Sequence, residues 1–409
     1  MNLNEYFSKK IRNDYQREYF DHFLKKIGFN YNVPSIHIAG TNGKGSTATY
    51  LASIYRHSGL KVGLFISPAL VNINEMISIN GELISDSNLE KYINEYHKQI
   101  DKFDLSAFEI QTFIALKYFA DNNCDISIIE CGMGGETDAT NVFTPILSII
   151  TSVSLEHTMF LGRTLSEIAL QKCGIIKENV PVILGSNNED VVNTVYNYAR
   201  EYSSKVFNVV EPSSVIYSSN GYSFSYGGHN DVKIQSHALY SVKDACLALE
   251  AVNVLSSQYA VSEENIIDGL WDTNLPARLS FVRKNPLVII DGGHNPEAIY
   301  NLCISLNNIA NSTPIHTVFA SFKDKNIERM RAMLGEISAD ITLTSFDHPR
   351  ARSYEEYFLF AEDYTYKDDA IRAIREAMTN YPDDIVLITG SLAFAGYIFS
   401  LFEKGEFDE

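Results

Sequence analysis

The stretch 40–47, Gly-Thr-Asn-Gly-Lys-Gly-Ser-Thr, combines residue types that hold phosphate groups. Its glycines let the backbone adopt positive φ and turn N–H groups inward, Lys44 supplies a positive charge, and Ser46 or Thr47 offers a hydroxyl to Mg²⁺. The strict P-loop pattern is not met, because Gly45 stands where Ser or Thr would follow the lysine. We therefore predict a variant phosphate loop; the alternative is a tight turn that binds no ligand.

Two further residues could hold metal ions at the ends of strands. Glu130 ends the apolar run 125–130 and precedes a second glycine-rich turn, and an acid in that position beside a phosphate loop can bind magnesium. His157 follows Glu156 after the apolar run 146–152, and this pair is a candidate metal site. The alternatives are a glutamate that is only solvated and a histidine with a structural role.

The stretch 291–296, Asp-Gly-Gly-His-Asn-Pro, has the same arrangement as the first loop, a glycine-rich turn between a strand and a helix. The apolar run 287–291 delivers an acid, two glycines turn the chain, and Asn295 with Pro296 starts a helix. We interpret this stretch as a second ligand loop, with an unliganded turn as the alternative. Two sheets that each offer such a loop predict a cleft between two domains, in which the first loop holds the phosphates of ATP.

These loops need buried strands and helices to position them. Over residues 36–184 apolar runs alternate with helical periodicities, which is typical of βαβ units in a parallel sheet. Residues 212–235 change to short alternating segments that favour an antiparallel hairpin region, and breaks at 275–286 mark a domain boundary. We predict an α/β protein with a P-loop-type, mostly parallel sheet domain at 1–280 and a smaller Rossmann-like α/β domain at 281–409.

Composition limits the possible partners and the compartment. The 409 residues include 33 Lys+Arg and 51 Asp+Glu, a formal net charge of −18. Nucleic acids and anionic membranes attract positive surfaces, so we expect neither as a partner. The five cysteines are widely spaced, which indicates a reducing compartment and neither a disulfide framework nor a thiolate zinc site. We expect a cytoplasmic monomer whose partners are small molecules.

Several short motifs occur in order along most of the chain. They are found at 40–46, Ser67-Pro68, Asn74-Glu75, 134–142, 172–177, 275–279, 291–296, 323–325 and 388–392. Each motif is weak alone, but the ordered set resembles the folate branch of the Mur-type ATP-dependent amide ligases, the folylpolyglutamate and dihydrofolate synthases. The resemblance implies that ATP converts a folate carboxylate to an acyl phosphate, which the amine of L-glutamate attacks to give an amide. It implies dihydropteroate as a second possible acceptor.

The resemblance also implies roles for individual residues. The catalytic residues would be Lys44, Lys172 and His294, with Lys172 carbamylated. The ligands of Mg²⁺ would be Ser67, Glu130 and His157. The residues that bind ATP would be Thr41, Asn42, Gly43, Lys44, Gly45, Ser46, Thr47, Arg278, Asp291 and His294.

The chain departs from the family pattern at several positions. Ala69 stands where members often have His, and Ala238, Ser241 and Asp244 stand where they usually have Gly, Gln and an Asn that contacts ATP. An Asp accepts hydrogen bonds but offers no amide donor. A catalytically altered ATP-binding paralogue and an amide ligase for a different carboxylate therefore stay as alternatives. A peptidoglycan ligase is not expected, because such enzymes normally carry a further domain before the phosphate loop.

Overall fold

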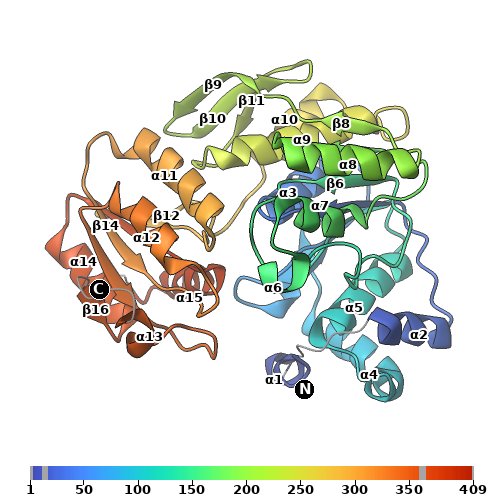
Figure 1. Cartoon of the computed structure of the whole chain (residues 1–409), viewed down its shortest axis with the longest axis horizontal. Helices are drawn as coiled ribbons and strands as arrows, with labels where there is room; N and C mark the ends of the chain where they lie inside the picture. The colour runs from blue at the N-terminus through green and yellow to red at the C-terminus, as the bar shows by residue number, and fades with distance from the viewer. Residues whose placement is uncertain (1–2, 12–16, 359–364, 408–409) are drawn as a thin grey trace. The chain divides into compact units, whose positions relative to one another are not determined.

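The computed structural model describes residues 3–11, 17–358 and 365–407 (Figure 1). The chain forms two compact units. The first comprises Met1–Ser214, Phe224–Lys233 and Lys243–Thr273, and the second comprises Val215–Ser223, Ile234–Val242 and Asn274–Glu409. Each unit is therefore assembled from more than one segment of the sequence.

An eight-stranded sheet forms the centre of the first unit. Its strands are β1 Ser35–Ala39, β2 Val62–Phe65, β3 Ile77–Ile79, β4 Glu82–Leu83, β5 Ile126–Glu130, β6 Leu147–Ile150, β7 Val182–Leu184 and β8 Val206–Asn208, in the spatial order β4-β3-β2-β5-β1-β6-β7-β8. The strands from β2 to β8 in this order pair in parallel, whereas β3 and β4 are antiparallel to their neighbours. This confirms the prediction of a mostly parallel sheet.

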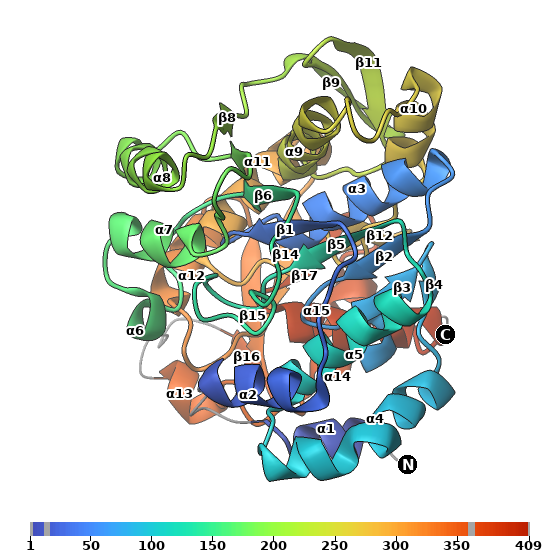
Figure 2. The same cartoon turned by 90° about the vertical axis from the view of Figure 1, so that its right-hand side faces the viewer.

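Helices cover both faces of this sheet. The helices of this unit are α1 Leu3–Ser8, α2 Arg17–Ile27, α3 Lys44–His57, α4 Asp86–Lys102, α5 Ala107–Asp121, α6 Thr158–Leu161, α7 Leu165–Cys173, α8 Glu189–Glu201, α10 Glu263–Trp271 and most of α9 Tyr240–Val254, with a short 3-10 helix η1 Ile73–Met76. Figure 2 shows α3 and α5 on opposite faces of the central strands. Strands β1, β2 and β5 are buried along their whole length, as both-sided coverage requires.

A separate three-stranded sheet lies where the sequence predicts a hairpin region. Its strands are β9 Ser213–Ser218, β10 Gly221–Tyr226 and β11 His229–Ile234, in the order β11-β10-β9. Alternating buried and partly buried residues along β10 match the alternating pattern of the sequence.

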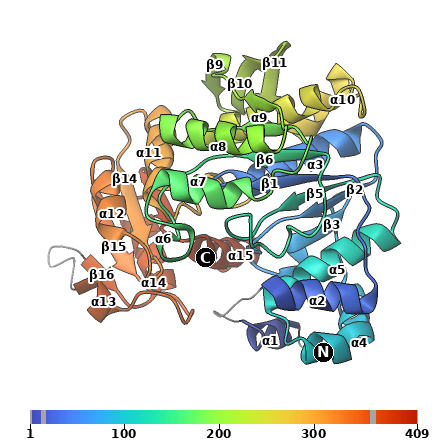
Figure 3. The same ribbon diagram turned by 45° about the vertical axis from the view of Figure 1, so that its right-hand side comes forward.

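A six-stranded sheet forms the centre of the second unit. Its strands are β12 Ser280–Lys284, β13 Leu287–Ile290, β14 Ile315–Phe319, β15 Asp340–Thr344, β16 Thr365–Lys367 and β17 Ile385–Thr389, in the order β12-β13-β17-β14-β15-β16. Only β12 pairs antiparallel within the described part of this sheet. Its helices are α11 Pro296–Ala310, α12 Ile327–Gly335, α13 Tyr354–Phe358, α14 Ala370–Asn380 and α15 Leu392–Glu403. With α11 and α12 on one side and α15 on the other (Figure 3), the Rossmann-like prediction is confirmed.

The structure also differs from the sequence-based expectations in places. The helix α3 begins at Lys44, so residues 44–47 of the predicted phosphate loop belong to its first turn. The predicted boundary region contains β12, so the expected division at residue 280 coincides with the first residue of a strand. Among the described helices, none combines the length and the apolar composition that a membrane span requires.

Candidate functional site

The stretch 40–47 forms the turn between β1 and α3. Gly43 is the N-cap of α3 and has a φ of 84°, a conformation that residues with side chains rarely adopt. Because glycine has no side chain, Gly43 offers no side-chain hydrogen-bond acceptor to the first N–H groups of the 14-residue helix. These N–H groups, at the positive end of the helix dipole, suit an anion.

Residues that follow β6 fix the shape of this loop. The Thr151 hydroxyl donates to the carbonyl of Asn42 at 2.6 Å, and the N–H of Asn42 donates to the Ser152 hydroxyl at 2.9 Å. The N–H of Thr41 donates to the Ser152 carbonyl at 2.8 Å, and the Thr41 hydroxyl accepts from the N–H of Ser154 at 3.0 Å. Thr41 and Asn42 therefore hold the loop in place through these contacts.

Glu130 stands beside this loop, since it pairs with Ile38 in the register of β5 and β1. Its Oε2 accepts from the N–H of Ser67 at 2.9 Å, and its Oε1 lies 3.7 Å from Nζ of Lys44. The carboxylate is buried, and the Lys44 side chain is 15% exposed. The structure thus brings three predicted site residues together from the carboxyl ends of neighbouring parallel strands, where ligands bind in such sheets.

The hydroxyl residues of the loop are buried as well. Ser46 is 4% exposed and Thr47 is fully buried. Within the described part of the chain, the Thr47 Oγ1 has no hydrogen-bond partner. An unpaired buried hydroxyl costs roughly 1–3 kcal/mol, so a ligand that pairs with it would stabilise the protein.

The oxygen atoms at this place fit a magnesium ion. Among residues 3–11, 17–358 and 365–407, no three His, Cys, Asp or Glu side chains cluster as a metal site. Mg²⁺ usually takes only one or two carboxylates, together with water and substrate phosphates. The buried Glu130 carboxylate and the unpaired Thr47 hydroxyl of the loop suit that mode of binding.

Lys172 lies in α7 and is 2% exposed. Burial lowers the pKa of Lys172 to about 7, and the positive charge of Lys44 acts in the same direction. A large fraction of the Lys172 side chains is therefore a neutral amine at neutral pH.

His157 lies in the segment after β6, where it is the N-cap of α6 with a φ of 51°. Positive φ is uncommon for a residue other than glycine. The next residues include Met159 and Phe160, whose side chains are 93% and 67% exposed. The position of His157 after a strand of the central sheet matches the sequence analysis, and its role as a metal ligand stays a prediction.

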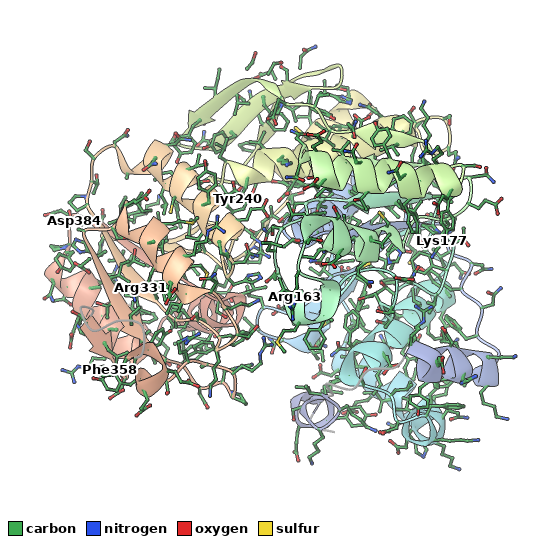
Figure 4. All side chains as sticks on the ribbon, viewed as in Figure 1. Arg163, Lys177, Tyr240, Arg331, Phe358 and Asp384 are labelled. Carbon is green, nitrogen blue, oxygen red and sulfur yellow. The ribbon has the colours of Figure 1, made fainter. Side chains whose placement is uncertain are left out.

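Asp291 organises the second predicted loop. It follows β13 and is 3% exposed. Its Oδ2 accepts from the Tyr240 hydroxyl at 2.5 Å and from the N–H of Leu279 at 2.9 Å, while its Oδ1 accepts from the N–H of Gly293 at 2.8 Å. Burial raises the pKa of Asp291, whereas the bond from Tyr240 and the charge of Arg278 lower it. Tyr240 is the first residue of α9 and is labelled in Figure 4.

Arg278 and His294 flank this carboxylate along the chain. The N–H of Gly292 donates to the carbonyl of Ala277 at 2.8 Å, which holds the Arg278 segment against the loop. The His294 Nδ1 lies 3.0 Å from the carbonyl of Gly292 and must be the donor, because a carbonyl only accepts. The second unit thus groups Arg278, Asp291 and His294 at one place.

Some residues that shape the first site were not predicted. His37 in β1 is buried, and its Nε2 lies 2.8 Å from the Thr140 hydroxyl, which donates to Oδ1 of Asp138 at 2.5 Å. Asp138 also accepts from the N–H of Met133 at 2.8 Å and so fixes the turn after Glu130. Burial lowers the pKa of His37 to about 3, so the ring is neutral. The sequence signal was the run 134–142, to which no individual role was given.

Two unpredicted hydroxyls lie at the end of β17. Thr389 and Ser391 are 0% and 1% exposed, and neither hydroxyl has a hydrogen-bond partner among the described residues. The motif at 388–392 contains both, which was the available signal.

Comparison with known proteins gives matches over most of the chain. Residues 38–252 match the model of the Mur ligase middle domain, and residues 277–392 match that of the Mur ligase glutamate ligase domain. The chain is 32% identical over 387 residues to a dihydrofolate synthase/folylpolyglutamate synthase of Bacillus subtilis, covering 88% of this chain and 89% of the relative. It is also 32% identical to a folylpolyglutamate synthase of Lacticaseibacillus casei, covering 89% and 88%.

Solved structures agree with these matches. The chain superposes with a TM-score of 0.90 and 25% identity on a Mycobacterium tuberculosis folylpolyglutamate synthase complexed with ADP, covering 98% of this chain and 97% of the other. For the apo form of the L. casei enzyme the TM-score is 0.86 at 28% identity, with 97% and 98% covered.

Proposed function

Because the chain belongs to the folylpolyglutamate synthase/dihydrofolate synthase family of Mur ligases, we propose that it is an ATP-dependent ligase. It joins the amine of L-glutamate to the glutamate carboxylate of a reduced folate. The observation that carries the proposal is the grouping of Lys44, Glu130 and Ser67 at the ends of parallel strands. Dihydropteroate is the second acceptor that we propose to test, since the B. subtilis relative carries both names.

The loop 40–47 would bind the phosphates of ATP. The N–H groups at the start of α3 meet the phosphate oxygens, and the Lys44 ammonium offsets their charge. The ADP bound to the M. tuberculosis relative supports an adenine nucleotide as the ligand. We assign Thr41, Asn42 and the loop glycines to its shape and its N–H donors.

Ser67, Glu130 and His157 would hold magnesium at this site, and the ion would neutralise the phosphates as charge moves onto the leaving ADP. The position of Glu130 at the end of β5 and the hydrogen bond that it accepts from the N–H of Ser67 support this role. The two chemical steps are carried out by the substrates and by the residues of the chain.

In the first step, the acceptor carboxylate attacks the γ-phosphorus, the bond to the bridging oxygen breaks and ADP leaves. In the second, the amine of glutamate attacks the acyl carbon, phosphate leaves with the electron pair of the C–O bond, and the nitrogen loses a proton. Two anions must meet in the first step, so the ammonium of Lys44 and the N–H groups of α3 lower the repulsion between them. Arg278, Asp291 and His294 would also bind ATP, as the family resemblance implies.

Lys172 would act as a carbamylated residue. Carbon dioxide adds to neutral amines, and a buried lysine with a pKa of about 7 supplies that form at neutral pH. The product is a carboxylate, which would add a further negative ligand for magnesium.

The cellular setting that we propose is the cytoplasm. All five cysteines are buried and free, which is typical of a reducing compartment. The monomeric state stays a prediction.

The test is incubation with MgATP, L-glutamate and tetrahydrofolate, or dihydropteroate in a parallel reaction. We expect a product extended by one glutamate, detected by mass spectrometry, and release of ADP that depends on the acceptor. Lys44→Met should lower the rate at least about 100-fold, whereas Lys98→Met on the exposed side of α4 should leave it within about twofold. Nucleotide binding without turnover on any pteroate or folate would favour a catalytically altered paralogue instead.

A further inference from the structure

Asp244 places a carboxylate directly against the phosphate loop. It lies in α9 and is 7% exposed. A Cβ atom built on Gly43 would be only 2.2 Å from Oδ1 of Asp244. The carboxylate therefore occupies the space in which a side chain at position 43 would lie, next to the first N–H groups of α3.

A second carboxylate lies on the other side of Lys44. A Cβ atom built on Gly45 would be 3.2 Å from Oε2 of Glu130, whose other oxygen is 3.7 Å from the Lys44 ammonium. The loop thus has a carboxylate against each of the two glycines that flank its lysine. Both carboxylates bring negative charge to this part of the site before any ligand binds.

The negative charge of these carboxylates opposes a nucleotide that arrives without metal. Free ADP carries about three negative charges at neutral pH, and magnesium removes two of them. A like charge held at low exposure beside the phosphates is poorly screened by water, so its repulsion is felt most by the metal-free form.

On the basis of the proposed function, we propose that Asp244 is a selectivity residue that makes this loop reject metal-free adenine nucleotides and accept their magnesium complexes. Asp244 contacts the loop and takes no part in the chemical step. Its replacement by Asn keeps the shape and one oxygen acceptor but removes the charge.

The experiment is calorimetric titration of the full chain with ADP, once with magnesium chloride and once with EDTA. For Asp244→Asn we expect binding of metal-free ADP to tighten by about five- to tenfold and binding of the magnesium complex to change less than about twofold. The dissociation constant of metal-free ADP divided by that of the magnesium complex should therefore fall. The tightening of metal-free ADP binding should shrink as sodium chloride is added, because salt screens charge.

The matched control is Glu250→Gln, which removes one charge from the same helix away from the loop. Gln still accepts the bond that the Tyr226 hydroxyl donates to Glu250 at 3.0 Å, and the ratio should stay at the wild-type value. Thermal unfolding without nucleotide checks the fold, and Asp244→Ser is the second neutral variant if Asn destabilises the protein.

An unchanged ratio in Asp244→Asn and Asp244→Ser, or loss of binding of the magnesium complex, would overturn the inference. In either of these outcomes the wild-type protein still binds MgADP, so the proposed function would not be contradicted. A wild-type protein that binds ADP in neither buffer would overturn both.

Discussion

Lys172 is a buried amine whose charge depends on pH near neutrality. The pKa of Lys172 in the folded chain is about 7. At pH values below it, both the folded and the unfolded chain hold the proton, and the folded chain carries the full cost of a buried ammonium group. As pH rises from about 7 toward the ordinary value of 10.5, the folded chain has already lost the proton and the cost disappears. Its contribution to stability therefore improves with rising pH.

Replacement by methionine should remove this dependence. In CO₂-free buffer we expect Lys172→Met to be more stable than the wild type at about pH 6, and this advantage to narrow by roughly 2 kcal/mol at about pH 9. Urea unfolding at the two pH values gives the difference. An advantage that is the same at both would show that Lys172 does not titrate as a buried amine in this range.

Sequence patterns found the site residues that end strands or form glycine-rich turns. Lys44, Glu130 and Asp291 are of this kind, because an apolar run followed by a polar residue marks the end of a buried strand. The partners that orient them come from distant segments. Tyr240 precedes Asp291 by 51 positions in the sequence, and only the fold brings their oxygens to 2.5 Å.

At the scale of elements, the loop between β1 and α3 depends on the absence of a side chain at position 43. The φ of 84° and the Asp244 oxygen 2.2 Å from the site of a Cβ atom both exclude larger residues. Gly43→Ala must therefore shift the loop, the start of α3 or Asp244. The strained backbone alone costs about 1–3 kcal/mol.

We expect Gly43→Ala to lower the melting temperature and to weaken binding of MgADP by at least about tenfold, because the N–H groups no longer converge. Gly59→Ala is a matched control, since Gly59 also has positive φ, at 89°, but no atom lies within 4 Å of its Cβ position. Calorimetry and thermal unfolding measure both effects. Equal binding by the two variants would show that the loop tolerates a side chain.

The predicted elements were those with a strong apolar pattern and an unambiguous turn. β5 agrees with the apolar run 125–130 within one residue. β12 was not predicted, because it is a partly exposed edge strand whose sequence, Ser-Phe-Val-Arg-Lys, joins a segment with two prolines. Its pairing with β13 comes from tertiary structure, which local patterns do not report.

At the scale of the whole molecule, the net charge of −18 makes long-range repulsion a measurable part of stability. Salt screens this repulsion, with a Debye length of about 10 Å at about 0.1 M. We expect the melting temperature to rise by about 2–5 °C as sodium chloride increases from about 0.02 to about 0.2 M. Tetramethylammonium chloride should act equally, because the effect needs ionic strength and no bound cation. A falling melting temperature would mean that local ion pairs outweigh the repulsion.

The assembly of each unit from several segments affects the order in which the protein can fold during synthesis. The first unit needs Lys243–Thr273, which leave the ribosome after two segments of the second unit, Val215–Ser223 and Ile234–Val242. Gly269 of α10 packs against the backbone of Ile54 in α3, the helix that begins at the phosphate loop. The phosphate loop is therefore among the earliest parts of the chain to be translated, yet the helix that carries it gains the packing of α10 only when about two thirds of the chain has been made.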